Sequence, residues 1–352
     1  LIYNAIITLL FVSEMKTFLI TVFIFVFATQ DANADVRRNA SILSNFENII
    51  KGQTVADAVT CENVSNEDFE LLLYTRKNPM YAISIDKQSP DLDSNKKLVI
   101  IIHGWGQLPY DNKMQNLKNA YLNRYDTNVI IVNWEKLALD YYRSIMCKVP
   151  KLGQKIAEFL CTLNKNYGID LDDVHLVGHC VGAHMAGIIG QTTNSMCQEQ
   201  IGRITGLDPM GPLYNNAPKP QRLDASDANF VDIIHTNAGF LGYHGNCGHV
   251  DFYVNCGAIQ VGCALPDDGL KSTTHLPLSI GTCHHMRSID IWAEAVETDN
   301  FKATPCYYCP MGCPPVLSMN KEKIIMGEKC PKNAKGGYYV KTDDKRPYAL
   351  FS

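Results

Sequence analysis

The sequence predicts an α/β protein whose mostly parallel central sheet carries helices on both faces. Short, almost continuously apolar runs alternate with segments whose apolar residues recur at helical spacing. Strands that are apolar throughout are buried on both faces, which is typical of parallel sheets. One such run ends directly in a glycine-flanked turn that opens a helix. A cluster of cysteines and prolines after residue 300 further predicts a disulfide-tied C-terminal tail.

The composition is that of a globular protein. The chain has 352 residues, of which 46% are hydrophobic and 19% charged, so it is too apolar for a disordered protein. A net charge of -4 gives no basis for nucleic-acid binding, and we expect no nucleic-acid partner. Because no repeat or linker interrupts residues 35–352, we expect a single domain there, and a monomer.

The beginning of the chain has the pattern of a leader. Met15–Ala34 has a basic start, an apolar run over 17–28 and a small-x-small cleavage site, as signal peptides do. The apolar run is too short to span a membrane, which argues against the alternative of a membrane helix. Residues 1–14 resemble translated upstream sequence. We therefore expect residues 1–34 to be absent from a secreted, extracellular protein.

Secretion gives meaning to two further features. Asn39 and Asn63 each stand in an Asn-x-Ser sequence, and both become candidate glycosylation sites once the chain enters the secretory pathway. Thirteen cysteines also suit an oxidising compartment better than the cytosol.

The elements follow from the apolar runs. No element is assigned to residues 35–70. A helix is predicted over 151–164, a second helix begins after Val181, and a last strand lies near 337–340. Five runs are predicted to be strands of one sheet: 97–102, 128–133, 173–178, 203–207 and 230–235.

The most informative stretch lies between the third strand and the second helix. Gly178–Gly182 reads Gly-His-Cys-Val-Gly, which is the pattern of a nucleophile elbow. Glycines flank the central residue because its strained turn brings neighbouring chains too close for Cβ atoms. Cys180 is thereby presented at the carboxyl edge of the sheet and at a helix N-terminus, which favours developing negative charge. Cys180 stands where such elbows usually have Ser.

Several separate blocks resemble the animal pancreatic-lipase superfamily over about residues 70–352. The superfamily includes neutral lipases, insect phospholipases A1 and yolk proteins that have lost catalysis, and the resemblance implies an α/β-hydrolase fold. Since the chain ends at Ser352, we expect the C-terminal lipid-binding sandwich of the family to be absent. The blocks that carry the resemblance are His103–Gly106, Gly178–Gly182, Gly206–Pro212, Arg222–Asp224, Gly248–Tyr253 and Cys283–Ser288.

The resemblance implies a triad of Cys180, Asp208 and His285, in the chain order of α/β-hydrolases. Asp208 follows a strand, so its carboxylate belongs at the carboxyl edge of the sheet. His284 is the alternative base. His285 is preferred because it stands two residues before Arg287, as the base does in the family's block.

Further positions also match the family. The backbone N–H groups of Trp105 and Val181 are implied as oxyanion donors, one from the loop after the first strand and one from the residue after the nucleophile. Cys263 and Cys283 bracket the segment that corresponds to the family's lid and are expected to pair.

No cofactor or metal is expected. Arg222, Asp224 and Asp227 resemble a calcium site of some family members, but Lys219 stands where an acidic partner belongs. The remaining cysteine run, Cys-x2-Cys-x3-Cys, allows a zinc knuckle as an alternative, which secretion disfavours.

The other cysteines are only partly assignable. Setting Cys180 aside leaves an even number, and Cys247 and Cys256 flank a hairpin and are candidates to pair. Two bridges are expected in the tail, among Cys306, Cys309, Cys313 and Cys330. The connectivity stays open for Cys61, Cys147, Cys161 and Cys197.

Two functions remain open at this stage. The first is a secreted carboxylic-ester hydrolase for phospholipids or acylglycerols, acting at a lipid or membrane surface, because a thiolate beside an imidazole is a good nucleophile. A short lid segment and a short loop over 237–247 resemble phospholipase A1 members. The second is a catalytically impaired protein that binds or stores lipid, since a site shaped for Ser misplaces the tetrahedral oxygen when sulfur replaces it, and ~1 Å of misplacement can cost about 10²-fold in rate.

Overall fold

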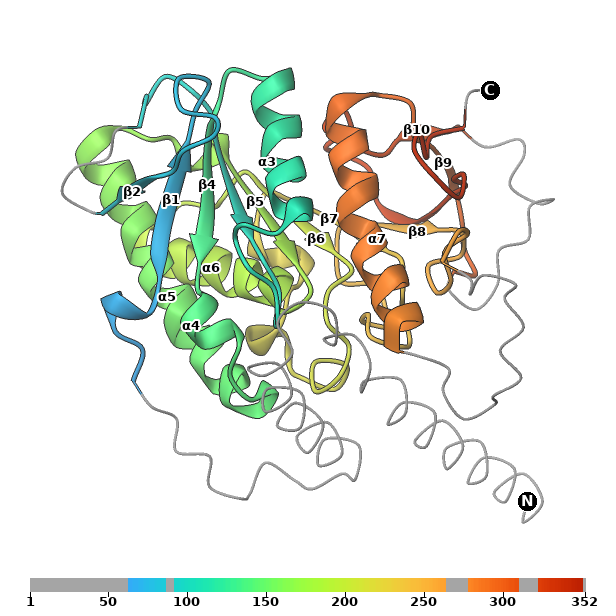
Figure 1. The fold of residues 1–352 in the computed structure, drawn as a ribbon, viewed down its shortest axis with the longest axis horizontal. Coiled ribbons are helices and arrows are strands. Elements are labelled where there is room, and N and C mark those ends of the chain that lie inside the picture. The colour runs from blue at the N-terminus through green and yellow to red at the C-terminus, as the bar shows by residue number, and fades with distance from the viewer. Residues whose placement is uncertain (1–62, 87–91, 264–277, 310–321, 351–352) are drawn as a thin grey trace, which may run out of the picture.

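The computed structural model describes residues 63–86, 92–263, 278–309 and 322–350 (Figure 1). The leader, Asn39 and the middle of the lid lie outside these residues. The helices are α3 (Asn112–Arg124), α4 (Glu135–Ala138), α5 (Tyr142–Tyr167), α6 (Val181–Cys197) and α7 (Leu278–Glu297), with short 3-10 helices η1 (Asn66–Asp68), η2 (Leu171–Asp173), η3 (Lys219–Gln221) and η4 (Ala225–Asp227).

The strands of the described residues form one sheet in the order β10-β9-β11-β8-β7-β6-β5-β3-β4-β1-β2. The run from β11 to β4 is parallel, and antiparallel strands extend it at both edges. The bounds are β1 (Glu70–Tyr74), β2 (Ile83–Ile85), β3 (Leu98–Ile102), β4 (Asn128–Asn133), β5 (Val174–His179), β6 (Arg203–Leu207), β7 (Phe230–His235), β8 (Val250–Val254), β9 (Lys302–Pro305), β10 (Ile324–Ile325) and β11 (Gly336–Val340).

The predicted fold class is confirmed: the chain has an α/β-hydrolase fold with a mostly parallel sheet. The five predicted strands are β3 to β7, each within one residue of its expected bounds, and they are neighbours in the sheet. The edge strands were not predicted. β2, β9 and β10 have only three, four and two residues, so their apolar signal is weak. β1 was missed although residues 71–74 are apolar and buried.

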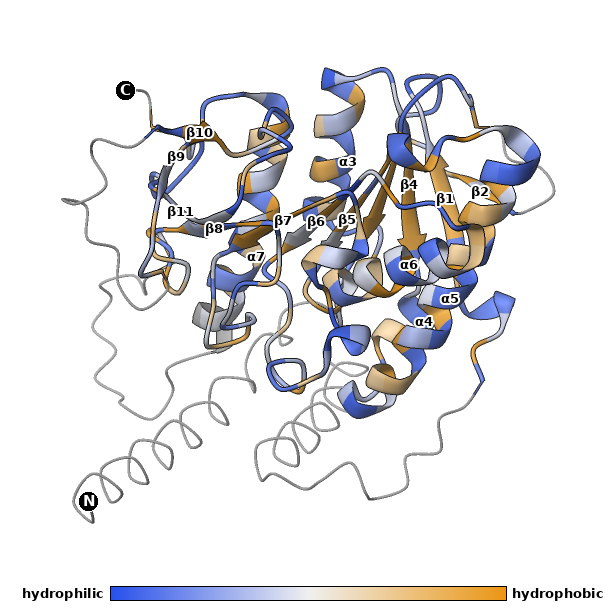
Figure 2. Cartoon of the chain, turned by 180° about the vertical axis from the view of Figure 1, so that it is seen from behind, coloured by the Kyte–Doolittle hydropathy of each residue, from blue (hydrophilic) through white to orange (hydrophobic). Residues whose placement is uncertain are grey.

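Both faces of the sheet are covered, as the apolar runs require. On β3, Leu98, Ile100 and Ile102 pack in the cluster that contains α5 and α6, whereas Val99 and Ile101 pack in the cluster that contains α3 and α7. Figure 2 shows hydrophobic colour concentrated on the central strands and hydrophilic colour on the outer helix surfaces. The polar site residues can therefore gather only where the strands end.

Helix α5 is longer than the sequence predicted. The spacing of apolar residues predicted 151–164. Pro150 stands just before that range, and proline normally ends or kinks a helix. The helix instead continues through Pro150 over 26 residues. Its buried face packs on α6, and a disulfide between Cys161 and Cys197 joins the two helices, a pairing that the sequence left open.

Two of the predicted disulfide pairings are wrong. Cys247 is a free, buried thiol, whereas Cys256 is disulfide-bonded, so these two do not pair. In the tail, Cys306 pairs with Cys309, but Cys330 is also free and buried. Cys247 and Cys330 pack in the two apolar clusters, where a thiol behaves as a small apolar side chain. The even count of the other cysteines therefore does not single out Cys180.

Candidate active site

Cys180 lies on a sharp turn between β5 and α6, as the elbow pattern predicted. Its backbone φ of 59° and ψ of -123° lie in a region that residues other than glycine rarely adopt. A Cβ on Gly178 would lie 2.3 Å from the carbonyl oxygen of Gly182, and one on Gly182 would lie 2.3 Å from the carbonyl oxygen of Ile102. Both glycines are therefore required by contact, and the turn presents Cys180 at the carboxyl edge of the sheet.

Asp208 lies directly after β6 and is fully buried. Its Oδ1 accepts the backbone N–H groups of Thr236 (2.8 Å) and Asn237 (2.9 Å). Its Oδ2 lies 2.5 Å from Nδ1 of His285. The loop after β7 thus holds one carboxylate oxygen, and the other is free to orient the imidazole.

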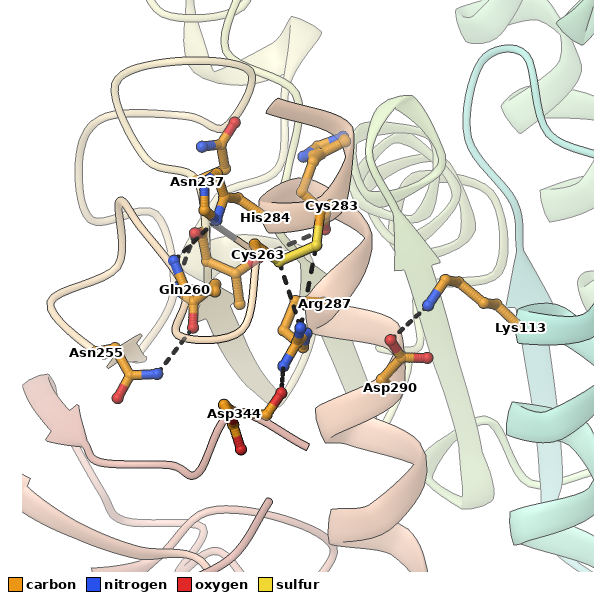
Figure 3. Close-up of a disulfide and its surroundings, with 12 residues drawn as sticks. Lys113, Asn237, Asn255, Gln260, Cys263, Cys283, His284, Arg287, Asp290 and Asp344 are labelled. Carbon is orange, nitrogen blue, oxygen red and sulfur yellow. Dashed lines mark hydrogen bonds and ion pairs between the residues drawn. A yellow bond between two sulfur atoms is a disulfide. The ribbon is translucent and has the colours of Figure 1, made fainter. Parts of the chain in front are cut away.

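Of the two adjacent histidines in α7, His285 is the one that reaches Asp208. Burial alone would lower the pKa of His285, but the negative charge available at Cys180 and the hydrogen bond with Asp208 outweigh burial and raise that pKa. His284 faces elsewhere: its Nδ1 accepts the backbone N–H of Gln260 at 2.9 Å (Figure 3). The geometry therefore agrees with the preference for His285 over His284.

The thiol and the base are neighbours, and their interaction contributes to the raised pKa of His285. The Cys180 thiol is directed at the sulfur of Met210, with 3.6 Å between Sγ and Sδ. Among the described residues, Nε2 of His285 is buried without a hydrogen-bond partner. No pattern in the sequence indicates that Met210 contacts the predicted nucleophile.

The loop after β3 lies against Cys180. A Cβ on Gly104 would lie only 2.5 Å from the Cβ of Cys180. Trp105 follows in this loop, and its indole N–H donates to the carbonyl of Asp140 at 3.0 Å. Val181 is the first residue of α6, where backbone N–H groups have no partner within the helix. Both predicted oxyanion donors thus belong to backbone adjoining the thiol.

The lid segment is closed at its base by the expected disulfide between Cys263 and Cys283 (Figure 3). Arg287 lies beside the bridge, with Nη2 3.3 Å from the sulfur of Cys263, and its Nη1 donates to the carbonyl of Asp344 at 3.0 Å. These contacts fix the helical turn that carries His285.

The residues at the resembled calcium position do not fit a metal ion. The ammonium of Lys219 lies 3.2 Å from Oδ1 of Asp224, and Nη1 of Arg222 lies 3.7 Å from Oδ2 of the same carboxylate. Within the described residues, no group of three or more His, Cys, Asp or Glu could hold a metal. At the zinc alternative, the bridge between Cys306 and Cys309 uses two of the thiols that zinc would need.

Sequence reasoning also missed Gln107. Nδ1 of His179 lies 2.6 Å from Oε1 of Gln107, a contact that joins residues 72 positions apart. No spacing pattern marks such a contact, because Gln107 lies in an irregular loop.

Comparisons with known proteins identify the family of the chain. A model of the lipase family, described as "Lipase", matches residues 41–348. Lipase member H from Oryctolagus cuniculus is 33% identical over 303 residues, which cover 80% of this chain and 64% of that protein. Pancreatic triacylglycerol lipase from the same species is 32% identical over 273 residues, covering 69% of this chain and 57% of that protein. The chain thus spans less than two thirds of the length of these relatives.

Solved structures give a more distant likeness. Esterase 2 from Thermogutta terrifontis is 14% identical, with a TM-score of 0.33 over 50% of this chain and 69% of that one, which is too distant to bear on function. The match to the family model covers most of the chain, and the matched residues include the positions of the elbow, Asp208 and His285. The chain belongs to the lipase family.

Proposed function

We propose that this protein is a secreted carboxylic-ester hydrolase that acts on lipid esters, phospholipids or acylglycerols, with Cys180 as nucleophile, Asp208 as acid and His285 as base. The observation that carries the proposal is the buried 2.5 Å contact between Asp208 and His285 beside a thiol on a strained elbow. Membership of the lipase family supports a lipid substrate. Two relatives are a lipase member H and a pancreatic triacylglycerol lipase by name.

The first half of the reaction transfers the acyl group to sulfur. Nε2 of His285 takes the thiol proton, and the thiolate adds to the ester carbonyl carbon. A C–S bond forms and the carbonyl electron pair moves to oxygen, where the N–H groups of Trp105 and Val181 stabilise the charge. When that pair returns, the C–O bond breaks, and Nε2 gives its proton to the departing alkoxide.

The second half releases the fatty acid. Nε2 of His285 takes a proton from water as the water oxygen attacks the thioester carbonyl, again with the negative charge on the carbonyl oxygen. The C–S bond then breaks and the thiolate is regenerated beside an imidazolium. Asp208 remains ionised and holds Nδ1–H of His285, so that Nε2 faces the reacting atoms throughout.

Secretion is part of the proposal. None of the described helices is long and apolar enough to cross a membrane. Asn63 is exposed, and its side-chain oxygen accepts a hydrogen bond from Nζ of Lys151 at 3.3 Å. Asn39 lies outside the described residues and is proposed on its sequence alone. Treatment of the purified protein with a glycosidase, followed by mass measurement, tests both sites.

One observation favours the alternative of lipid binding without turnover. The thiol is directed at the sulfur of Met210, with 3.6 Å between the two sulfur atoms. A Cys180 thiol that is directed at the thioether of Met210 must rotate toward His285 before it can react. The alternative keeps the fold and the lipid surface but removes the reaction.

The test compares the protein with Cys180→Ala and Cys180→Ser on short-chain esters, phosphatidylcholine and a triacylglycerol. Turnover by the parent that Cys180→Ala abolishes supports the hydrolase. A parent no faster than Cys180→Ala, together with an active Cys180→Ser, supports the alternative on a scaffold shaped for Ser. If all three are inactive while vesicles still bind, the protein is a lipid-binding protein only.

A further inference from the structure

Gln107 lies where three segments of the candidate site meet. Its Oε1 accepts the backbone N–H of Gly104 at 2.7 Å, and the same oxygen lies 2.6 Å from Nδ1 of His179. Its Nε2 lies 3.3 Å from the sulfur of Met286. Gln107 is buried, with 6% of its surface exposed. One side chain therefore joins the oxyanion loop, the residue before the nucleophile and the residue after the base.

The chemistry of these partners fixes the proton on His179. A backbone N–H can only donate, so the atom of Gln107 that faces Gly104 must be the amide oxygen. That oxygen can only accept, and Nδ1 of His179 must therefore carry a proton. Burial, reinforced by the positive charge available at His285, lowers the pKa of His179 well below its ordinary value, so the ring is neutral and its Nε2 is an acceptor.

The remaining contact of His179 then gives it no support. Its Nε2 lies 3.3 Å from the carbonyl oxygen of His285, which is also an acceptor. That carbonyl is satisfied by the hydroxyl of Ser288 at 2.9 Å. The ring of His179 nevertheless packs against the ring of His285, with 4.6 Å between centroids. Among the residues that the structure describes, the hydrogen bond to Gln107 is thus the one favourable polar contact that holds His179 against the base.

The other bond of Gln107 acts on the oxyanion loop. The backbone of Gly104 packs directly against Cys180. A Cβ added to Gly104 would lie 2.5 Å from the Cβ of Cys180 and 2.8 Å from Oε1 of Gln107. The peptide that follows Gly104 carries the N–H of Trp105. A shift of the Gly104 backbone therefore moves this proposed donor relative to the sulfur, and catalytic geometry is intolerant of shifts near 1 Å.

We propose that Gln107 is a positioning residue, which holds the oxyanion-loop backbone and the imidazole of His179 in the geometry that acyl transfer to Cys180 needs. This inference rests on the proposed function. Gln107 touches neither the substrate carbonyl nor the sulfur, and it acts through Gly104 and His179. Its amide oxygen is the essential atom, because both bonds end there.

The test separates the oxygen from the bulk of the side chain. Gln107→Leu fills similar space without an acceptor, whereas Gln107→Glu keeps an acceptor in place. We expect Gln107→Leu to lower kcat by about 10²-fold with KM within about threefold of the parent. Gln107→Glu is expected to stay within about tenfold of the parent kcat, as a rescue by the conservative change.

Asn128→Leu is the matched control. Asn128 is also buried, at the amino end of β4, and its side-chain amide is hydrogen-bonded to the backbone of Asp93, through Oδ1 at 3.3 Å and Nδ2 at 2.9 Å. Asn128→Leu therefore measures the general cost of replacing a buried side-chain amide by an apolar group. Equal losses of kcat in Asn128→Leu and Gln107→Leu would overturn the inference.

A second measurement does not need turnover. An alkyl trifluoromethyl ketone adds reversibly to a thiolate, so that a C–S bond forms and the carbonyl electron pair becomes an oxyanion. We expect Gln107→Leu to weaken binding of the ketone to Cys180 by about 10²-fold, with Gln107→Glu and Asn128→Leu close to the parent. Unchanged ketone binding in Gln107→Leu overturns the positioning role. If Gln107→Leu does not fold, Gln107→Asn, whose amide is one methylene shorter, is expected to give the same loss.

The two measurements on the Gln107 variants can fail independently of the proposed function. If the parent and Cys180→Ser both lack turnover, the hydrolase proposal fails, while ketone binding still decides the role of Gln107. If the parent turns over and Gln107→Leu matches it in kcat, the hydrolase proposal stands and the positioning role is wrong.

Discussion

Both ends of strands β5, β6 and β7 carry buried polar clusters, but only one of the two clusters has all its hydrogen bonds satisfied among the described residues. At the amino ends, Arg203 binds Asp232 at 2.7 Å, Thr205 donates to Asp232 at 2.7 Å, and His175 lies 2.8 Å from Thr205. None of these four side chains has a buried polar atom without a hydrogen-bond partner. Tyr121 and Glu328 extend the network through their own bond of 2.9 Å.

At the carboxyl ends, buried imidazoles keep atoms without partners. Nε2 of His103, Nδ1 of His235 and Nε2 of His285 have no hydrogen-bond partner among the described residues. Leaving such an atom buried costs free energy, whereas a satisfied network stabilises the fold. The cluster at the amino ends is satisfied and stabilises the fold. The cluster at the carboxyl ends leaves an imidazole nitrogen free to accept a proton, which general-base chemistry requires.

Asp208→Asn should have the largest effect, and it breaks the carboxyl end. The new amide can still accept from Thr236 and Asn237 through its oxygen, but its NH₂ faces Nδ1 of His285. The imidazole then takes the other tautomer, and its Nε2 no longer accepts a proton. We expect hydrolysis to fall by about 10⁴-fold, as in other triads, with the free energy of unfolding changed by only about 1 kcal/mol.

Ester hydrolysis and urea unfolding of this variant measure the two quantities separately. A large loss of stability with little loss of rate would contradict the division between the two ends.

Arg203→Met should have the next largest effect, and it breaks the amino end. Asp232 is fully buried, so removal of its cation leaves an uncompensated charge. We expect the free energy of unfolding to fall by about 3–5 kcal/mol, measured by urea unfolding, with kcat of the folded protein unchanged. The double variant Arg203→Met/Asp232→Leu should lose less stability than the single one, because it removes the buried charge as well. A greater loss in the double variant would show that the pair is not the source of the effect.

Much of this comparison could be predicted from the sequence, and part of it could not. The elbow was predictable because Gly178 and Gly182 are imposed by short-range contacts within one turn, and the strands because burial on both faces makes them apolar. Gln107 was not predictable, since its partner His179 is 72 residues away. Met210 was missed for the same reason: it meets Cys180 across 30 residues.

The cysteine pairing failed for a related reason. Spacing suggested a bridge from Cys247 to Cys256, but the apolar environment that buries Cys247 as a free thiol exists only in the folded chain. Asp208 and His285 were placed by their family blocks, and physical pattern alone would have left His284 as an equal candidate for the base.

Asp227 sharpens the comparison, because it too has a buried oxygen without a hydrogen-bond partner among the described residues, but it lies outside the candidate site. Its Oδ2 accepts the backbone N–H of Asp224, but its buried Oδ1 has no partner among the described residues. Burial raises the pKa of Asp227 from 3.8 to about 7. The folded protein therefore binds this proton more tightly than the unfolded chain does. The stability that it contributes is fully present below about pH 4 and is lost as the pH rises through about 7.

Unfolding measured at pH 5 and pH 8 tests this. We expect the parent to lose about 2–3 kcal/mol from this group between the two values, and Asp227→Asn to lose correspondingly less. The same pH dependence in the parent and in Asp227→Asn would assign it to another group.

Removal of metal ions should have the smallest effect, because the neighbouring acidic cluster is closed by the chain's own cations. Lys219 and Arg222 both face Asp224, at 3.2 and 3.7 Å, where the resemblance suggested calcium. A chelator is therefore expected to leave the unfolding midpoint unchanged. Lys219→Ala should cost at most about 1 kcal/mol, since the Lys219 side chain is 69% exposed and solvent screens the pair. A midpoint that falls with the chelator and recovers with calcium would show instead that this cluster is open, and that Lys219 moves aside to admit the ion.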